Sequence, residues 1–129
     1  HSLMDWHHAD GWRCAFDTED RRRFNRFIRD LNTELPTRYG KIDILWYDAG
    51  WPLDTAEKLE GRKLNAMVRR LQPDILINGR AHTREDFDNS EASIHASEPG
   101  RAWEACMTFN GSAESLTKHG HARSIEAAE

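Results

Sequence analysis

The sequence has few cysteines, no long apolar run and no excess of basic residues. Its 129 residues include two cysteines, Cys14 and Cys106, and their wide separation fits neither a zinc motif nor a disulfide framework. No stretch of about 18 apolar residues occurs, which excludes a transmembrane helix and argues against a membrane partner. The formal net charge is −4 and no basic face stands out, so nucleic acid is not expected as a partner.

The first strongly patterned segment predicts a long amphipathic helix. Asp17 or Thr18 is a suitable N-cap, and acidic residues follow in the first turn. Pro36 and Gly40 are expected to end the helix. Its apolar stripe has helical spacing and consists of Phe24, Phe27, Ile28, Leu31 and Leu35.

A second helix is expected between residues 54 and 73. Asp54 and Glu57 resemble a capping pair at its start, and Pro73 stops it. An apolar stripe with the same spacing consists of Leu64, Met67, Val68 and Leu71.

Short apolar segments alternate with these helices. Ser2–Trp6, Ile42–Tyr47 and Asp74–Asn78 are predicted strands, and the β-α-β-α-β order favours parallel pairing with right-handed crossovers. Residues 79–100 are expected to form a polar loop, and Arg101–Phe109 a further strand. The predicted fold class is therefore α/β.

Charged residues stand where three of the predicted strands end. Asp5, Asp48 and Arg80 follow strand ends, and ligands of parallel α/β sheets bind beyond those ends. Indoles stack on apolar sugar faces while charged groups bond hydroxyls, so the pattern favours a polyol ligand. A purely structural alternative makes Asp48 the start of a turn and Trp51 a cap on the core. The neighbouring loops carry Trp6, His7, His8, Trp51, His82 and Glu91.

The histidines and the remaining tryptophans have simpler interpretations. His7 and His8 are adjacent, whereas a zinc site needs three or four converging ligands, so no metal and no cofactor are expected. A role in shaping the aglycone side of the pocket fits these histidines better. Trp12 and Trp103 are interpreted as packing residues.

Five motifs in order carry a family resemblance: "SLMDWHH", "KIDILWYDAGWP", "LQPDILINGR", "DFDNSE" and "WEACMTFNGS". Over Ser2–Ser112 the chain resembles the catalytic barrels of α-L-fucosidases of glycoside hydrolase family 29. The resemblance implies that residues 1–112 are part of a (β/α)₈ TIM-like barrel, with about three to four β/α units. Residues 113–129 do not match and are interpreted as a divergent, weakly helical tail.

The resemblance also implies a reaction. Retaining glycosidases use two carboxyl groups ~5–5.5 Å apart, one as nucleophile and one as acid/base. The family nucleophile corresponds to Asp48. The acid/base corresponds to Glu91 in a "DF-x-x-x-E" motif, with Glu104 of "WE" as the alternative. Arg80 matches the family arginine that reaches the sugar, and Trp51, His7, His8 and Trp6 are the expected substrate-binding residues. The substrate would be terminal α-L-fucose on a glycan.

Two other classes remain open from the sequence. A non-catalytic fucose-binding protein derived from the same barrel would keep the pocket and tolerate loss of the Asp48 carboxylate. A phosphotransferase with an acyl-phosphate aspartate fits less well, because no Gly-rich phosphate loop accompanies Asp48. Because a full barrel takes ~250 residues, we expect this chain to be a piece of one. Alone it is expected to be inactive, marginally stable and prone to associate.

Overall fold

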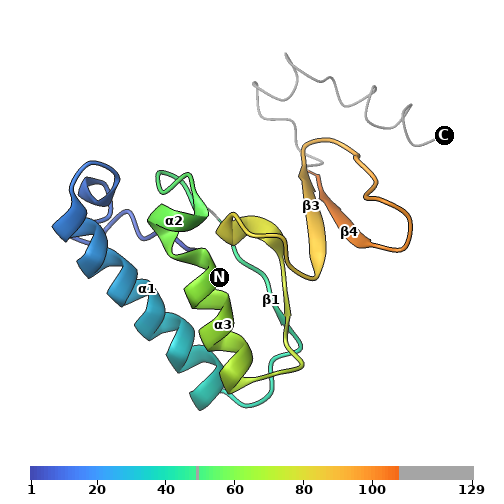
Figure 1. Cartoon of the computed structure of the whole chain (residues 1–129), viewed down its shortest axis with the longest axis horizontal. Coiled ribbons are helices and arrows are strands. Elements are labelled where there is room, and N and C mark those ends of the chain that lie inside the picture. The colour runs from blue at the N-terminus through green and yellow to red at the C-terminus, as the bar shows by residue number, and fades with distance from the viewer. Residues whose placement is uncertain (49, 108–129) are drawn as a thin grey trace. The chain divides into compact units, whose positions relative to one another are not determined.

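The computed structural model describes residues 1–48 and 50–107, which fall into two units, His1–Asp86 and the segment from Phe87 onward. Within the described part, no helix is both long and apolar enough to cross a bilayer. The elements in chain order are η1 (Arg13–Ala15), α1 (Thr18–Arg38), β1 (Ile44–Leu45), α2 (Ala56–Leu59), α3 (Gly61–Leu71), β2 (Leu76–Ile77), η2 (Gly79–Ala81), β3 (Phe87–Glu91) and β4 (Ala102–Cys106) (Figure 1).

Helix α1 begins as predicted and ends later than predicted. The Asp17 carboxylate accepts the backbone N–H groups of Glu19 and Asp20, at 2.8 and 2.9 Å, as an N-cap does. The prediction that Pro36 ends the helix is wrong, because α1 continues to Arg38. A proline in the last turn removes only one ladder hydrogen bond. Gly40 follows at φ 84°, a left-handed conformation that suits glycine just beyond a helix.

The second predicted helix is broken in two. Thr55, not Asp54, caps α2 by accepting the backbone N–H of Lys58 at 3.2 Å. Asp54 instead pairs with the Lys58 ammonium at 2.7 Å, so the predicted capping pair is wrong. Glu60 adopts a left-handed φ of 56° and separates α2 from α3. Leu64 and Val68 of the predicted stripe are buried, as expected of an amphipathic helix.

The strands of the first unit pair in parallel, which confirms the predicted parallel pairing. Strands β1 and β2 pair with Ile44 opposite Leu76 and Leu45 opposite Ile77. Ser2 forms a parallel bridge with Asp48, but the rest of the predicted strand 2–6 is not a strand. The chain turns there, where the N–H of His8 donates to the carbonyl of Asp5 at 3.2 Å.

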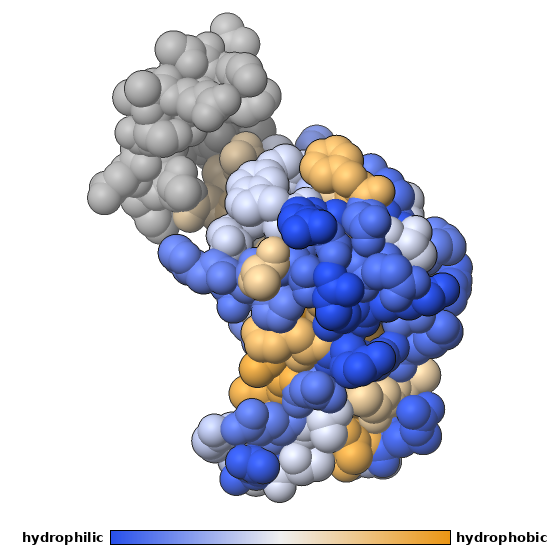
Figure 2. Space-filling view, turned by 90° about the vertical axis from the view of Figure 1, so that its left-hand side faces the viewer, coloured by the Kyte–Doolittle hydropathy of each residue, from blue (hydrophilic) through white to orange (hydrophobic). Residues whose placement is uncertain are grey.

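Helices cover one face of this sheet. Leu45 and Ile77 are buried, whereas Ile44 and Leu76, whose side chains point to the opposite face, are 54% and 45% exposed. Helices α1 and α3 run side by side on the covered face (Figure 1). The side of the molecule toward α1 is mainly hydrophilic, with a few apolar patches (Figure 2). Because Ile44 and Leu76 are apolar and exposed, the other face of the sheet is apolar and uncovered within this unit.

The second unit contains a strand where a loop was predicted. Strand β3 pairs in parallel with β4, with Phe87 opposite Ala102 and Glu91 opposite Cys106. The prediction of an unbroken loop over residues 79–100 is therefore wrong. Polar side chains support the pair: Arg101 bonds Asp88 at 2.6 Å. The end of the predicted strand at Phe109 and the predicted tail 113–129 lie outside the described residues.

We expect Arg69→Ala to lower the free energy of unfolding by about 2 kcal/mol. Arg69 donates to Glu85 at 2.8 Å, to Asp86 at 2.7 Å and to the carbonyl of Ile75 at 3.1 Å. Its removal leaves two partly buried carboxylates without this guanidinium. Urea unfolding of the protein measures the change. Arg70→Ala, at the neighbouring exposed arginine, is the control. Equal midpoints for both variants would contradict the prediction.

The same network predicts a pH dependence of stability. Burial raises the pKa of Glu85, but hydrogen bonds from Arg69, Asn65 and Thr83 outweigh it, so the pKa lies below its ordinary value of 4.5. A lowered folded-state pKa stabilises the fold above pH 4.5, and this contribution is lost as the pH falls through the folded value. In Arg69→Ala the free energy of unfolding should fall less steeply as the pH is lowered below 4.5, because Glu85 no longer receives the hydrogen bond from Arg69.

Candidate active site

The first unit brings a carboxylate and a guanidinium together beyond its parallel strands. Asp48 follows β1 and Arg80 lies in η2, just after β2. Arg80 Nη1 donates to Asp48 Oδ1 at 3.2 Å, and its guanidinium lies 4.7 Å from the ring centre of Trp46. The Asp48 side chain is 54% exposed, whereas that of Arg80 is 19% exposed. A cation held on an indole thus stands beside an accessible carboxylate.

A buried amide positions the end of β1. Asn78 Oδ1 accepts the N–H of Tyr47 at 3.0 Å, and Asn78 Nδ2 donates to the carbonyl of Tyr47 at 2.8 Å. The side chain therefore pairs with the backbone as a neighbouring strand would. Asn78 is fully buried, and Tyr47 immediately precedes Asp48. The amide thereby fixes the backbone that carries the carboxylate.

Close packing holds η2, and with it Arg80, in place. A side chain on Gly61 would meet the carbonyl of Ala81 at 2.1 Å, so only glycine permits this approach of η2 to α3. His82 Nε2 lies 2.8 Å from the carbonyl of Leu53, which links η2 to the loop that follows Asp48. The two loops that carry Asp48 and Arg80 are therefore joined to each other.

Three indoles form a cluster in the same unit. Ring centres lie 4.8 Å apart for Trp6 and Trp12, 5.4 Å for Trp6 and Trp51, and 5.3 Å for Trp12 and Trp51. Their exposures are 39%, 52% and 58% in the order Trp6, Trp12, Trp51. Half-exposed indoles provide a flat apolar surface with polar N–H edges. Such a surface suits the apolar face of a sugar ring.

The loop that carries Trp6 and Trp12 is tied to α1. Arg23 Nε and Nη2 donate to the two oxygens of Asp10 at 3.0 and 2.9 Å, and this pairing lowers the pKa of the Asp10 carboxyl below its ordinary value. A side chain on Gly11 would meet the carbonyl of Asp5 at 2.3 Å. The loop is therefore tightly folded, which keeps two of its indoles beside each other.

The structure separates the two adjacent histidines. The ring of His8 packs on Phe24 and Phe27, at 5.3 and 4.6 Å, and its Nδ1 accepts the N–H of Asp10 at 3.1 Å. His8 is thus part of the packing against α1, and its contact with substrate stays a prediction. His7 is exposed, and its N–H donates to Asp5 Oδ1 at 2.9 Å.

In the second unit the two rival glutamates share one face. Glu104 lies opposite Asn89, which donates to its carboxylate, and Glu91 follows Asn89 by two positions on β3. Because side chains two positions apart point to the same side of a strand, Glu91 and Glu104 are diagonal neighbours. Glu91 is exposed at the end of β3 and Glu104 is half-buried. The expectation of a loop glutamate was wrong for Glu91.

Sequence reasoning missed three residues of this site. Trp12 was interpreted as a packing residue but is half-exposed within the indole cluster. Trp46 lies in the predicted strand Ile42–Tyr47, where nothing in the sequence indicates that its ring lies beside Arg80. Asn78 was the last residue of a predicted strand, and its position at the end of an apolar run, next to Gly79 and Arg80, was the available signal. Trp103, also interpreted as packing, is 41% exposed.

The sequence profile of the α-L-fucosidase family matches residues 1–124. No curated protein sequence matches the chain. Among solved structures, α-L-fucosidase isoenzyme 1 from Paenibacillus thiaminolyticus is 31% identical with a TM-score of 0.64, over 84% of this chain and 33% of its own.

Two further structures share the fold at lower identity. A bacterial fucosidase with a dihydroxy-methylpyrrolidine inhibitor is 24% identical with a TM-score of 0.70, over 82% of this chain and 29% of its own. An α-L-fucosidase from Bacteroides thetaiotaomicron, trapped as a covalent intermediate, is 22% identical with a TM-score of 0.67, over 82% and 30%. The chain thus spans about a third of the length of the solved fucosidases that it matches.

We expect Asn78→Ala to lower the free energy of unfolding by about 3 kcal/mol, because the buried N–H and carbonyl of Tyr47 both lose their partner. Urea unfolding followed by circular dichroism measures the loss. The control is Asn32→Ala, another fully buried asparagine, whose Nδ2 donates to the carbonyl of Ile28 in its own helix at 2.8 Å and lies 3.1 Å from His1 Nε2, so that it removes no partner of a strand backbone. A loss for Asn78→Ala no larger than for Asn32→Ala would contradict the role assigned to the amide.

Proposed function

This chain belongs to the α-L-fucosidase family, and we propose that it forms part of a retaining exo-α-L-fucosidase that releases terminal α-L-fucose from glycans. One observation carries the proposal: Asp48, the residue that matches the family nucleophile, is accessible and lies 3.2 Å from Arg80 beyond parallel strands. The longer protein that would contain this chain is called the parent enzyme below.

We propose that residues 1–112 contribute three to four β/α units to a (β/α)₈ barrel. Support comes from the parallel order of the Ser2 bridge, β1 and β2, with both long helices on one face of the sheet. The exposed side chains of Ile44 and Leu76 lie on the face that a closed barrel would fill with side chains. Further strands of the parent enzyme would cover them.

The proposed reaction has two steps. A carboxylate oxygen of Asp48 attacks the anomeric carbon of fucose, the bond to the leaving oxygen breaks, and that oxygen takes the proton of the acid/base residue. The acid/base then removes a proton from water, whose oxygen attacks the anomeric carbon and breaks the ester bond to Asp48. Arg80 keeps a positive charge beside Asp48 throughout and orients its carboxylate.

Glu91 is the proposed acid/base, and Glu104 is the alternative. Glu91 is exposed at the end of its strand, where a side chain can reach a leaving group. Glu104 accepts a hydrogen bond from Asn89 on the neighbouring strand, which holds its carboxylate in place, whereas Glu91 lies at the strand end. The proposal therefore keeps the family motif assignment.

The tryptophan cluster of Trp6, Trp12 and Trp51 is the proposed sugar-binding wall. Fucose has an apolar methyl group and apolar ring face, and both pack well on indoles. The same exposed cluster also supports the second candidate, a non-catalytic fucose-binding protein, because sugar stacking needs no nucleophile. The two candidates differ only in the need for the Asp48 carboxylate.

The parent enzyme is expected to hydrolyse 4-nitrophenyl α-L-fucoside, and Asp48→Gly should abolish turnover, because the covalent step requires the carboxylate. Glu91→Ala should lose activity that azide restores, with a product of retained configuration, since azide can replace water without a general base. Initial rates and product NMR measure both. Glu104→Ala is the matched control, because Glu104 neighbours Glu91 on the same face. This variant should keep its activity without azide.

Two outcomes would redirect these assignments. Near-normal activity of Glu91→Ala, together with azide rescue of Glu104→Ala, would move the acid/base role to Glu104. If the parent protein binds fucose but does not turn it over, and Asp48→Asn leaves the affinity for fucose unchanged, the second candidate, a non-catalytic fucose-binding protein, is the function supported.

The isolated 129-residue chain is expected to show no fucosidase activity and to self-associate, because the open face with Ile44 and Leu76 exposes apolar surface. Analytical ultracentrifugation and the same fucoside assay test this. Activity in a purified monomer of the chain would contradict it.

A further inference from the structure

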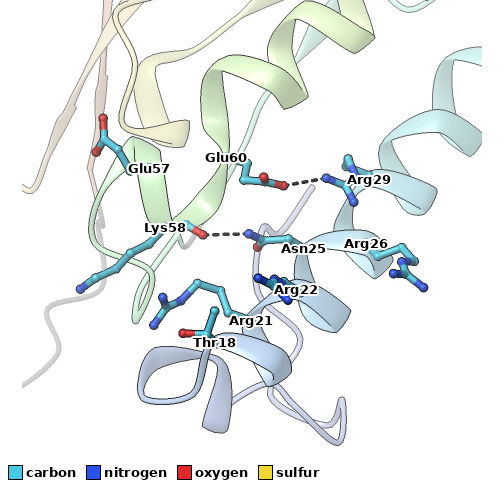
Figure 3. Close-up of a pocket in the computed structure, with 9 residues that line it drawn as sticks. All are labelled: Thr18, Arg21, Arg22, Asn25, Arg26, Arg29, Glu57, Lys58 and Glu60. Carbon is cyan, nitrogen blue, oxygen red and sulfur yellow. Dashed lines mark hydrogen bonds and ion pairs between the residues drawn. The ribbon is translucent and has the colours of Figure 1, made fainter.

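We propose that a cationic cavity between α1 and α2 binds the sulfate or carboxylate group of an acidic saccharide. The cavity has a volume of about 290 Å³. Ligand pockets usually measure roughly 300–1,000 Å³, so this one suits a single sugar-sized group. Its lining, drawn in Figure 3, consists of Thr18, Arg21, Arg22, Asn25, Arg26, Arg29, Glu57, Lys58 and Glu60.

The lining carries more positive than negative charge. The lining contains four arginines and one lysine but only two glutamates. Glu60 is engaged by Arg29 at 2.6 Å and by Lys63, which lies outside the lining, at 2.7 Å. The side chain of Glu57 points away from the arginines of α1 (Figure 3). A concave site with an excess of one sign of charge concentrates ions of the opposite sign.

Two of the arginines have no carboxylate partner in the described part of the chain. Arg21 donates to the backbone carbonyls of Cys14 and Ala15, each at 2.9 Å, so its charge is not neutralised. The side chain of Arg26 is exposed and makes no hydrogen bond or ion pair with any residue in 1–48 or 50–107. An anionic ligand would reduce the repulsion among these guanidinium groups.

Other cations of the lining can exchange their partners at little cost. Lys58 pairs with Asp54 at 2.7 Å and Arg22 with Glu19 at 2.5 Å, and both pairs are exposed. Exposed ion pairs contribute little to stability, so a ligand anion can compete for these cations.

A buried hydrogen bond holds together the two helices that line the cavity. Asn25, which is 5% exposed, donates from Nδ2 to the carbonyl of Lys58 at 2.8 Å and so ties α1 to α2. Thr18 begins α1, and the positive end of the helix dipole adds to the attraction for anions. The charged groups are therefore presented from two helices that are fixed to each other.

The choice of a saccharide rests on the proposed function, since a glycan substrate brings its other sugars near the enzyme. Guanidinium groups bind planar carboxylates and tetrahedral oxyanions through paired hydrogen bonds. The cavity lies in the helical layer, whereas Asp48 and Arg80 lie beyond the strand ends, so the two sites are distinct. A fucosylated glycan with an acidic sugar would thus have a second point of attachment.

Calorimetric titration of the parent enzyme with galactose 6-sulfate and with glucuronate tests the proposal, with uncharged galactose as the ligand control. Arg26→Ala combined with Lys58→Ala should weaken binding of both acidic sugars by about ten-fold or more. The matched control is Lys41→Ala with Arg70→Ala, because Lys41 likewise pairs with a carboxylate, that of Asp43 at 2.7 Å, and Arg70 is likewise an exposed arginine. This pair should leave the affinity unchanged.

Hydrolysis of 4-nitrophenyl α-L-fucoside, measured in parallel, should be unaffected by either pair of substitutions. If the wild-type protein binds the two acidic sugars but does not hydrolyse the fucoside, the result counts against the proposed fucosidase activity and not against the proposed anion-binding cavity. Absence of saturable binding to the folded wild-type protein would overturn the cavity proposal. Equal weakening by both pairs would also overturn it, because it would show attraction by overall charge alone.

Discussion

The arrangement of the candidate active site depends on one buried side chain, the amide of Asn78. Its two hydrogen bonds to Tyr47 continue the pairing of β1 and β2 beyond the last paired residues of the strands. A strand end normally loses its order where the ladder stops, but here the ladder is extended by a side chain that water cannot reach. Asp48 is the next residue, so the carboxylate leaves a rigid backbone.

Polar anchors hold the loops around this point in the same way. The Asp10–Arg23 pair fastens the loop of Trp6 and Trp12 to α1. The Arg69 network fastens the segment after η2 to α3. Both anchors use arginine, whose fork of donors can serve two acceptors at once. Loops are the natural place for binding groups, and here each is fixed to a helix of the scaffold.

The helical layer has a chemistry different from that of the strand ends. Apolar stripes of α1 and α3 pack inward on Leu45 and Ile77, which leaves the outward faces free for charge. On α1 that charge is largely arginine, and it gathers where α2 approaches. The proposed fucose site thus relies on indoles and one ion pair, whereas the proposed acidic-sugar site relies on unbalanced positive charge.

The sequence alone was sufficient for the helical stripes, the parallel order of strands and the family, because periodicity, strand ends and linked motifs are local features. It also predicted Asp48 and Arg80 near each other, since the rule on carboxyl ends of parallel strands needs only the element order. It did not predict that Thr55 rather than Asp54 caps a helix, because either residue type can serve and only backbone geometry selects one.

Contacts between distant residues were decided only by tertiary structure. His8 packs on Phe24 and Phe27, and Trp12 joins Trp6 and Trp51, and sequence position indicated neither set of contacts. The strand character of Glu91 likewise follows from pairing with β4, which a polar stretch does not reveal. Which side chains meet depends on how segments fold against one another, and no local pattern records that.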